Sequence, residues 1–199
     1  KKKNILQGPD YIILDKKFIN LKKRKSKKFR ILVTTGGTDN KQISIKIYNM
    51  LKILTNVVFY FIIGPGFKSN NPINKIKSKN VFLIKNETDL SKYYKKTDLS
   101  ITSGGISMFE SLVSGNVTLV TQLYKNQKYS IQYFKKKHII YVIGKGLNIY
   151  KDKLIKIIYK FIKEKNRKTL SFSKKNNFVD GKSILRIEKI LHKIIIKNN

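Results

Sequence analysis

Two glycine-rich stretches carry residue types that can bind a phosphorylated ligand. They are Thr34–Asp39, with the sequence TTGGTD, and Thr102–Glu110, with the sequence TSGGISMFE. Each follows a short apolar run and leads into a helical pattern. Its glycines let the backbone approach a ligand, and the start of the helix offers N–H groups. Ser103 and the two glycines after it can form a nest of N–H groups for a pyrophosphate. The alternative for the first stretch is a tight strand-to-helix turn capped by Thr38 or Asp39.

Glu110 is the acidic residue whose position could serve a nucleotide. It lies one turn into the helix that follows the second glycine pair, where Ser107 adds a hydroxyl. Helical side chains lean toward the N-terminus of their helix, so the carboxylate can reach a ribose beside the pyrophosphate and accept from its hydroxyls. The competing interpretation is an exposed glutamate stabilised by the helix dipole. The neighbours Met108, Phe109 and Leu112 make this helix mostly apolar, but the spacing alone leaves both interpretations open.

A third polar pair, Asn126 and Gln127, stands after an apolar run and at the start of a helical pattern. Asn126 can act as a helix N-cap, which is the usual role of asparagine at such a position. In the functional alternative, these amides contact sugar or phosphate oxygens at the same edge of the sheet. The chain has no cysteine and only two histidines, His138 and His192. It therefore offers no thiol nucleophile, and we expect neither a metal site nor a cofactor.

Alternating strand and helix patterns must position these residues. Short apolar, β-branched runs predict buried strands, and apolar residues at helical spacing predict the helices between them. The predicted strands are 30–34, 57–63, 81–84, 99–102, 117–120 and 139–143. The predicted helices are 42–54, 89–94, 106–114, 127–137, 150–164 and 182–197. This order predicts an α/β fold, doubly wound around a mainly parallel sheet that binds ligands at the carboxyl ends of its strands.

Residues 1–28 stand apart from this pattern. They carry scattered apolar residues and the basic run Lys22–Lys28. We interpret them as an N-terminal segment and linker that leaves an N-terminal domain missing from this chain. The ligand-binding domain then covers residues 29–199. Because the sequence does not begin with Met, it indicates a processed product, a trimmed chain or a fragment.

The net charge of +33 points to anionic partners. Of the 44 basic residues, 40 are lysine and four are arginine, although bidentate recognition of phosphates and bases favours arginine. The lysines are spread along the whole chain, so we interpret most of them as solvated surface rather than as a nucleic-acid interface. No apolar run is long enough to span a membrane, and no signal peptide is visible. A cytoplasmic location is consistent with these features.

The order of the motifs resembles a known family. GGTD at Gly36–Asp39, GPG at Gly64–Gly66, SGGxSxxE ending at Glu110 and NQ at a helix start are similar to the C-terminal domain of GT-B enzymes. In particular they resemble the UDP-sugar hydrolase of pseudaminic acid biosynthesis and its relatives in spore coat polysaccharide biosynthesis, which are similar to glycosyltransferase family 28. Gly8–Tyr11 resembles the family segment that leaves the N-terminal domain, and Asp180–Ile187 resembles a late DGxGxxRI motif.

The resemblance implies a UDP-sugar-binding, Rossmann-like half of a GT-B fold. The residues that it implies around the diphosphate are Gly36, Gly37, Ser103, Gly104, Gly105 and Ser107. Glu110 would bind the ribose, and the backbone of Ile84 would lie near the uracil. Asn126 and Gln127 would face the sugar or a phosphate. One departure is Asn116-Val117 after Gly115, where relatives have Gly-x-Pro.

In that family the catalytic histidine belongs to the N-terminal domain, so this chain alone would lack the catalytic base. His138 falls on a helix-to-strand turn and is interpreted as structural.

Three functions remain open. The first is the binding half of a UDP-sugar hydrolase in surface-polysaccharide or pseudaminic acid biosynthesis, acting with an N-terminal half domain or a partner subunit. The second is the donor-binding half of a UDP-sugar glycosyltransferase, whose basic surface would suit contact with an anionic membrane. The third is a basic nucleic-acid-binding protein, which the aromatic residues in strands and core helix faces disfavour.

Overall fold

The computed structural model of the chain describes residues 5–19, 21–166 and 179–198. The predicted N-terminal segment, 1–28, and the predicted ligand-binding domain, 29–199, each include residues outside these described ranges. Its centre is a seven-stranded sheet in the order β3-β2-β1-β4-β5-β6-β7. All neighbouring pairs are parallel except β6 with β7. The strands are β1 (Phe29–Thr34), β2 (Val57–Ile63), β3 (Val81–Lys85), β4 (Leu99–Ser103), β5 (Val117–Gln122), β6 (Ile140–Lys145) and β7 (Asn148–Ile149).

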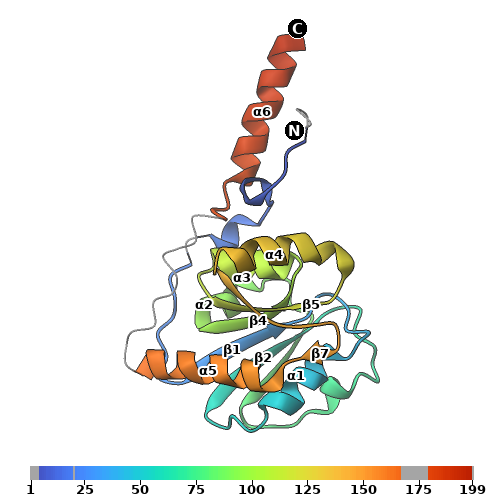
Figure 1. Cartoon of the computed structure of the whole chain (residues 1–199), viewed down its shortest axis with the longest axis vertical. Coiled ribbons are helices and arrows are strands. Elements are labelled where there is room, and N and C mark those ends of the chain that lie inside the picture. The colour runs from blue at the N-terminus through green and yellow to red at the C-terminus, as the bar shows by residue number, and fades with distance from the viewer. Residues whose placement is uncertain (1–4, 20, 167–178, 199) are drawn as a thin grey trace.

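Helices cover both faces of this sheet, which confirms the predicted doubly wound, Rossmann-like α/β fold (Figure 1). Helices α1 and α5 pack on one face, and α2, α3 and α4 pack on the other. The helices are α1 (Ile43–Leu51), α2 (Ser91–Lys96), α3 (Ile106–Val113), α4 (Lys128–Lys136), α5 (Lys151–Asn166) and α6 (Ser183–Asn198). Short 3-10 turns lie at η1 (Pro9–Tyr11), η2 (Lys16–Phe18), η3 (Pro72–Lys75) and η4 (Lys125–Gln127).

The central strand β1 carries the apolar run Ile31–Val33 because it is covered on both faces. In β1, Ile31 and Val33 pack in the cluster that α1 and α5 cover, whereas Leu32 packs with residues of α2. The exposed fractions of Ile31 and Leu32 are both 0%. Burying a side chain of this size stabilises the fold by about 1.5–3 kcal/mol. The continuous apolar run of β1 therefore follows from its place at the middle of the sheet.

The strand order reverses at β1, whose neighbours are β2 and β4. Chain connections run outward in opposite directions from such a point, which opens a crevice at the carboxyl ends of the two strands. Thr34 pairs with Thr102 across β1 and β4. The two glycine-rich stretches that follow these residues therefore begin side by side at the crevice.

The N-terminal segment packs against the helices instead of joining the sheet. Leu14 lies in the cluster of α3 and α4, and Phe18 lies in the cluster that contains Leu32 and Tyr94. Lys23 extends between the linker and the domain: its Nζ donates to the carbonyl oxygen of Tyr94 at 2.7 Å. The described part of this segment is thus anchored to the domain through buried contacts.

Some boundaries differ from the sequence prediction for local reasons. Helix α1 begins at Ile43, because Gln42 adopts a left-handed conformation with φ 52°. The antiparallel strand β7 was not predicted, since two residues are too few to show a period. Strand β5 begins at Val117 as predicted, although proline is missing there. The preceding Asn116 is buried, and its Nδ2 donates to the hydroxyls of Thr97 and Ser100 at 2.8 and 2.9 Å.

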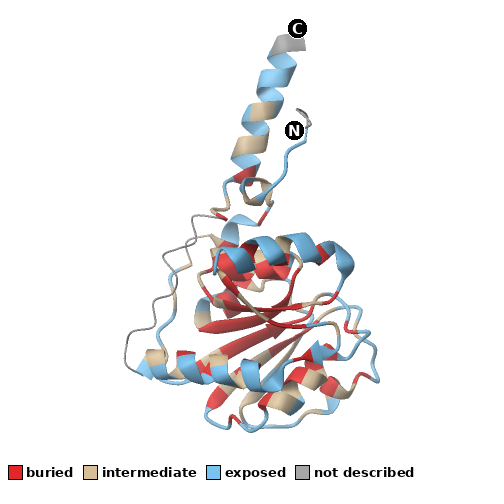
Figure 2. Cartoon of the chain, viewed as in Figure 1, coloured by how far each residue is buried: buried red, intermediate tan, exposed pale blue. Residues whose placement is uncertain are grey.

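Helix α6 projects away from the domain and leaves most of its surface exposed (Figures 1 and 2). Its start is tied to the N-terminal segment, because the Ser183 hydroxyl donates to the Ile12 carbonyl oxygen. Arg186 contacts both carboxylate oxygens of Asp180 and holds the pKa of that carboxyl down to about 2. Gly181 has φ 72°, and a Cβ there would lie 2.4 Å from the Ile19 side chain. The late motif, with Asp180, Gly181 and Arg186, therefore fixes the start of α6 against the N-terminal segment.

Candidate functional site

A cleft of about 460 Å³ opens at the carboxyl edge of the sheet, where β1, β2 and β3 end. Its walls come from the loops after these three strands and from the first turns of α3. Four of the residues proposed from the sequence line it together: Gly36, Gly37, Ser107 and Glu110. Within the part of the chain that the structure describes, no group of three or more histidine, aspartate or glutamate residues gathers to hold a metal ion.

The first glycine loop rests directly on the GPG loop after β2. Gly36 has φ 110°, a conformation that residues with a Cβ rarely adopt. The carbonyl oxygen of Gly37 accepts from the Gly66 N–H at 2.9 Å. A Cβ on Gly64 would lie 2.5 Å from that same oxygen. The two loops can approach this closely because glycine stands at positions 64 and 66, where a Cβ would meet Gly37 and Thr38.

The capping role considered for the first stretch belongs to Asp39. This buried carboxylate accepts from the N–H groups of Ile43 and Ser44 at 2.7 and 3.0 Å. It therefore occupies donors at the start of α1 and adds negative charge there. An anionic ligand gains less from α1 than from a helix whose first turn has no such carboxylate.

The first turn of α3, unlike that of α1, has no capping side chain. Its N-cap is Gly105, and no side chain bonds to the first N–H groups. Gly104 packs on α4, where a Cβ would lie 2.4 Å from Ile131 Cδ1. Ser103 is buried at the end of β4. The second glycine stretch thus directs an uncapped helix start, with its N–H groups and positive dipole end, toward the cleft that Ser107 lines.

Glu110 is half-buried in the wall of the cleft and does not stand on an exposed helix face. Burial raises the pKa of its carboxyl above the ordinary value, and the Tyr94 hydroxyl and the charge of Lys17 oppose this shift. The Tyr94 hydroxyl lies 3.5 Å from Glu110 Oε2. An ionised carboxylate accepts hydrogen bonds only, which suits the hydroxyl donors of a sugar.

Three other proposed residues lie beside this cleft. Ile84 packs with Leu32 and Ile62 near the end of β3, two residues before the cleft-lining Asn86. Thr38 is exposed, and its γ-methyl would lie 2.6 Å from a Cβ on Gly66. Gly105 lies next to Gln127, whose Nε2 would be 3.8 Å from a Cβ placed on that glycine.

The NQ pair has two different environments. Asn126 is exposed in the 3-10 turn η4. Gln127 is buried, and its Oε1 accepts from the N–H groups of Leu123 and Tyr124 at 2.9 and 3.3 Å. Gln127 therefore holds the loop after β5 in shape beside the second glycine stretch. His138 has φ 57° in the turn between α4 and β6, where the sequence placed it.

Sequence reasoning missed the part of the wall that follows β3. Asn86, Glu87 and Thr88 line the cleft there, and Asn86 has φ 53°. Glu87 pairs with Lys92 and also accepts from the Asp89 N–H at 2.8 Å, so it shapes its own loop. The sequence did offer a signal for these three residues, because they come directly after a predicted strand. Loops at the carboxyl ends of neighbouring parallel strands meet, so this position predicts a place in the same cleft.

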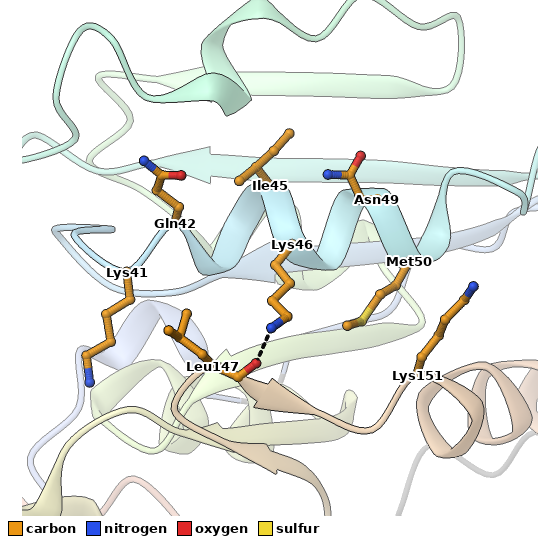
Figure 3. A pocket seen from close by; sticks show the side chains of 8 residues that line it. All are labelled: Lys41, Gln42, Ile45, Lys46, Asn49, Met50, Leu147 and Lys151. Atoms are coloured by element: carbon orange, nitrogen blue, oxygen red, sulfur yellow. Dashed lines mark hydrogen bonds between the residues drawn. The ribbon is translucent and has the colours of Figure 1, made fainter.

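A second groove, of about 400 Å³, lies between α1 and the turn from β6 to β7. Figure 3 shows Lys46 reaching across it to the carbonyl oxygen of Leu147. Lys41 and Lys151 stand at its margins, and Ile45 and Met50 supply apolar lining. None of the binding residues proposed from the sequence lines this groove. The candidate binding site is therefore the cleft beside the reversal of strand order at β1.

Comparison with known proteins gives relatives in sequence and in structure. No family model matches the chain. The spore coat polysaccharide biosynthesis protein SpsG of Bacillus subtilis is 25% identical over 195 residues, which cover 94% of this chain and 58% of SpsG. An uncharacterized protein of Methanocaldococcus jannaschii is 31% identical over 132 residues, or 60% of this chain and 27% of that protein.

Many solved structures share the fold, and two of them illustrate the likeness. Arabidopsis thaliana UGT89C1 complexed with UDP-L-rhamnose matches with a TM-score of 0.62 at 15% identity, over 87% of this chain and 45% of that one. UDP-GlcNAc 2-epimerase from Neisseria meningitidis bound to UDP-GlcNAc matches with a TM-score of 0.56 at 18% identity, over 85% and 45%. The chain therefore has a GT-B-like, Rossmann-like fold. It spans about half the length of these structures and of SpsG.

Proposed function

We propose that this chain binds a UDP-sugar and forms one half of a GT-B enzyme. The observation that carries the proposal is the cleft at the reversal of strand order, where a glycine loop, an uncapped helix start and a half-buried carboxylate meet. N–H groups and a helix dipole suit a diphosphate, and the carboxylate suits the hydroxyls of a ribose.

In this proposal the diphosphate lies between the loop of Gly36 and Gly37 and the stretch from Ser103 to Ser107, with Thr38 at its margin. The ribose lies against Glu110. The uracil lies at the end of β3, near the backbone of Ile84. Asn126 and Gln127 lie on the sugar side, and Gln127 is next to Gly105. Similarity to the folds crystallised with UDP-L-rhamnose and UDP-GlcNAc supports a ligand of this class.

We further propose that the complete enzyme is a UDP-sugar hydrolase of surface-polysaccharide or pseudaminic acid biosynthesis in the cytoplasm. Similarity to SpsG supports the polysaccharide context. A water molecule would attack the sugar–phosphate bond and UDP would leave, with the catalytic base supplied by the other half of the enzyme.

The second candidate is the donor half of a UDP-sugar glycosyltransferase, supported by the fold of UGT89C1. Its basic surface would then contact an anionic membrane. Among the helices of the described ranges, none is long and apolar enough to cross a bilayer.

The binding test is calorimetric titration with UDP in moderate salt, which suppresses loose attraction between lysines and phosphate. We expect one saturable site. Glu110→Ala removes a charged acceptor and should weaken binding by roughly 10-fold or more. Glu164→Ala removes a carboxylate from α5 instead and should leave affinity unchanged. If Glu110→Ala binds UDP as tightly as the unaltered chain, the site assignment is wrong.

The partner that completes the enzyme would dock on α6. This helix and Ile13 of the N-terminal segment border an apolar groove of about 360 Å³. The helix residues in its lining include Ile184, Ile187, Leu191 and Ile195. An exposed apolar surface of this kind marks a contact site. We propose that it receives the N-terminal half domain or partner subunit, because this chain spans only 58% of the length of SpsG.

Copurification of this chain with that half, expressed as a separate polypeptide, tests the docking surface. Leu191→Asp places a charge on the apolar face and should abolish copurification, whereas Lys193→Ala should not. Sedimentation of the chain alone is the second measurement. A dimer that Leu191→Asp converts to a monomer would show that a second copy covers the face, and the proposed occupant would be wrong.

A further inference from the structure

Tyr94 lies beneath the cleft and is completely buried, with an exposed fraction of 0%. It belongs to α2 and does not line the cleft. Its hydroxyl reaches α3, where it lies 3.1 Å from the carbonyl oxygen of Ser107 and 3.5 Å from Glu110 Oε2. Both acceptors belong to residues that line the cleft. Tyr94 therefore connects α2 to the two residues proposed to hold phosphate and ribose.

A buried tyrosine hydroxyl needs a hydrogen-bond partner, and its single proton is shared here between two acceptors on one helical turn. Burial and the nearby Glu110 charge raise the pKa of Tyr94 well above its ordinary value. The hydroxyl thus stays protonated and acts as a donor. The hydroxyl is closer to the Ser107 carbonyl oxygen, and its contact with Oε2 at 3.5 Å favours one orientation of the Glu110 carboxylate that leaves Oε1 to accept from a ligand.

The other side of Tyr94 is held by the N-terminal segment. The ring of Phe18 meets the Tyr94 ring edge-on, with 5.7 Å between the ring centroids. Lys23 Nζ donates to the Tyr94 carbonyl oxygen at 2.7 Å. Phe18 is buried and does not line the cleft. A continuous line of contacts therefore runs from Phe18 through Tyr94 to Glu110.

We infer that Tyr94 is a positioning residue that orients the Glu110 carboxylate for the ribose, and that Phe18 supports it from the N-terminal segment. The inference rests on the proposed function, because it requires a ribose against Glu110. A tyrosine that only filled the core would affect every ligand of the cleft equally. A tyrosine that orients Glu110 affects the ribose hydroxyl contact in particular.

The test compares the affinities for UDP and 2′-deoxy-UDP, which differ only in one hydroxyl. We expect the unaltered chain to prefer UDP, because a site built to bind a hydroxyl is left with an unpaired acceptor by the deoxy ligand. Tyr94→Phe should reduce this preference by roughly 3- to 10-fold, the size of one lost hydrogen bond. Phe18→Leu should reduce it less. Tyr141→Phe is the matched control, since Tyr141 packs on Phe161 at the opposite face of the sheet.

The outcomes separate the two proposals. If the unaltered chain fails to bind UDP, the proposed function is wrong and this inference falls with it. If the chain prefers UDP and Tyr94→Phe keeps the full preference, the binding proposal stands and the positioning role is overturned. Glu110→Gln gives a further check: Tyr94→Phe should cause no additional loss of preference in that background. Thermal melting of each variant confirms that affinities are compared between folded proteins.

Discussion

At the residue scale, the environment of Glu110 determines how binding should depend on pH. A carboxylate accepts hydrogen bonds at both oxygens, whereas a protonated carboxyl has lost part of that capacity. Burial raises the pKa of Glu110, so protonation begins at a higher pH than for an exposed glutamate. In the proposed site, the carboxylate therefore serves a ribose while it is ionised and loses this function as the pH falls through its raised pKa.

We accordingly predict that UDP affinity falls as the pH is lowered from neutral, and that the fall begins at a higher pH than an exposed glutamate would give. Calorimetric titration at several pH values measures the change. The terminal phosphate of UDP also gains a proton, because phosphate monoesters have a pKa of about 6. Glu110→Gln corrects for this effect, since it keeps the ligand titration and removes that of the carboxyl. Parallel pH profiles for the two proteins would contradict a role for ionised Glu110.

Two glycines of the cleft should respond differently to the same substitution. A Cβ on Gly64 would lie 2.5 Å from the Gly37 carbonyl oxygen, whereas a Cβ on Gly37 would meet no atom within 4 Å. Gly64→Ala should lower the free energy of unfolding by about 1–3 kcal/mol, the usual cost of overpacking. Gly37→Ala should leave stability nearly unchanged but weaken UDP binding, because the new methyl stands where the proposed diphosphate would approach. Thermal melting and titration measure the two effects, and equal destabilisation by both variants would contradict this account.

Which of these residues could be found from the sequence depends on how local their signal is. Gly36, Gly37 and Glu110 have a local signal, since strand, glycine pair and helix follow one another in the chain. The structure brings all three to one cleft. Tyr94 had no such signal, because its relation to Glu110 depends on how α2 packs against α3. The proposed role of the Tyr94 hydroxyl depends on its contact with Glu110, which lies 16 residues further along the chain.

At the scale of elements, the opposite edge of the sheet shows how the layers are held together. Lys165 at the end of α5 contacts Asp98 Oδ2 at 2.6 Å just before β4, and their side chains are only 14% and 8% exposed. The same oxygen accepts from the Arg30 N–H at 2.8 Å. This ion pair joins α5 to the amino ends of β1 and β4. It lies at the far end of the strands from the cleft.

Lys165→Met should therefore destabilise the fold without changing UDP affinity. It leaves the Asp98 charge buried with its partner removed, which typically costs about 3–5 kcal/mol. Lys160→Ala is the control, since Lys160 pairs with Glu164 at 3.8 Å on the exposed side of the same helix. Its loss should cost less than about 1 kcal/mol. Chemical denaturation measures both, and an equal effect of the two variants would contradict a structural role for the buried pair.

Most of these elements followed from periodicity, because a strand such as β1 and a helix such as α3 carry strong patterns. The exceptions have physical causes. Helix α1 begins one residue later than predicted, since Gln42 turns to a left-handed conformation, and it ends at Leu51, where a turn follows, instead of at Leu54. Helix α6 was predicted from its amphipathic pattern, but that pattern does not say what covers the apolar face. In the described structure this face is largely exposed, including Leu191 and Ile195.

At the scale of the whole molecule, the charge of +33 competes with the cleft as an explanation of what the chain binds. A nucleic-acid-binding protein would release many counterions on binding, so its affinity would fall steeply with salt. A ligand held by N–H groups, a helix dipole and Glu110 depends far less on the surface lysines. Salt therefore separates a general attraction from a built site.

We predict that the chain binds DNA weakly at low salt and loses this binding by about 200 mM, because a contact with six to ten phosphates loses roughly 10³–10⁵ in affinity over that range. UDP affinity should change by less than about 10-fold, since few charges take part. Fluorescence anisotropy with labelled DNA and calorimetry with UDP, in the same buffers, measure the two dependences. The Glu110→Ala variant should lose UDP binding and keep the DNA attraction. Tight DNA binding that persists at 200 mM salt, together with no UDP binding, would reverse the proposed function and make the lysine surface the functional site.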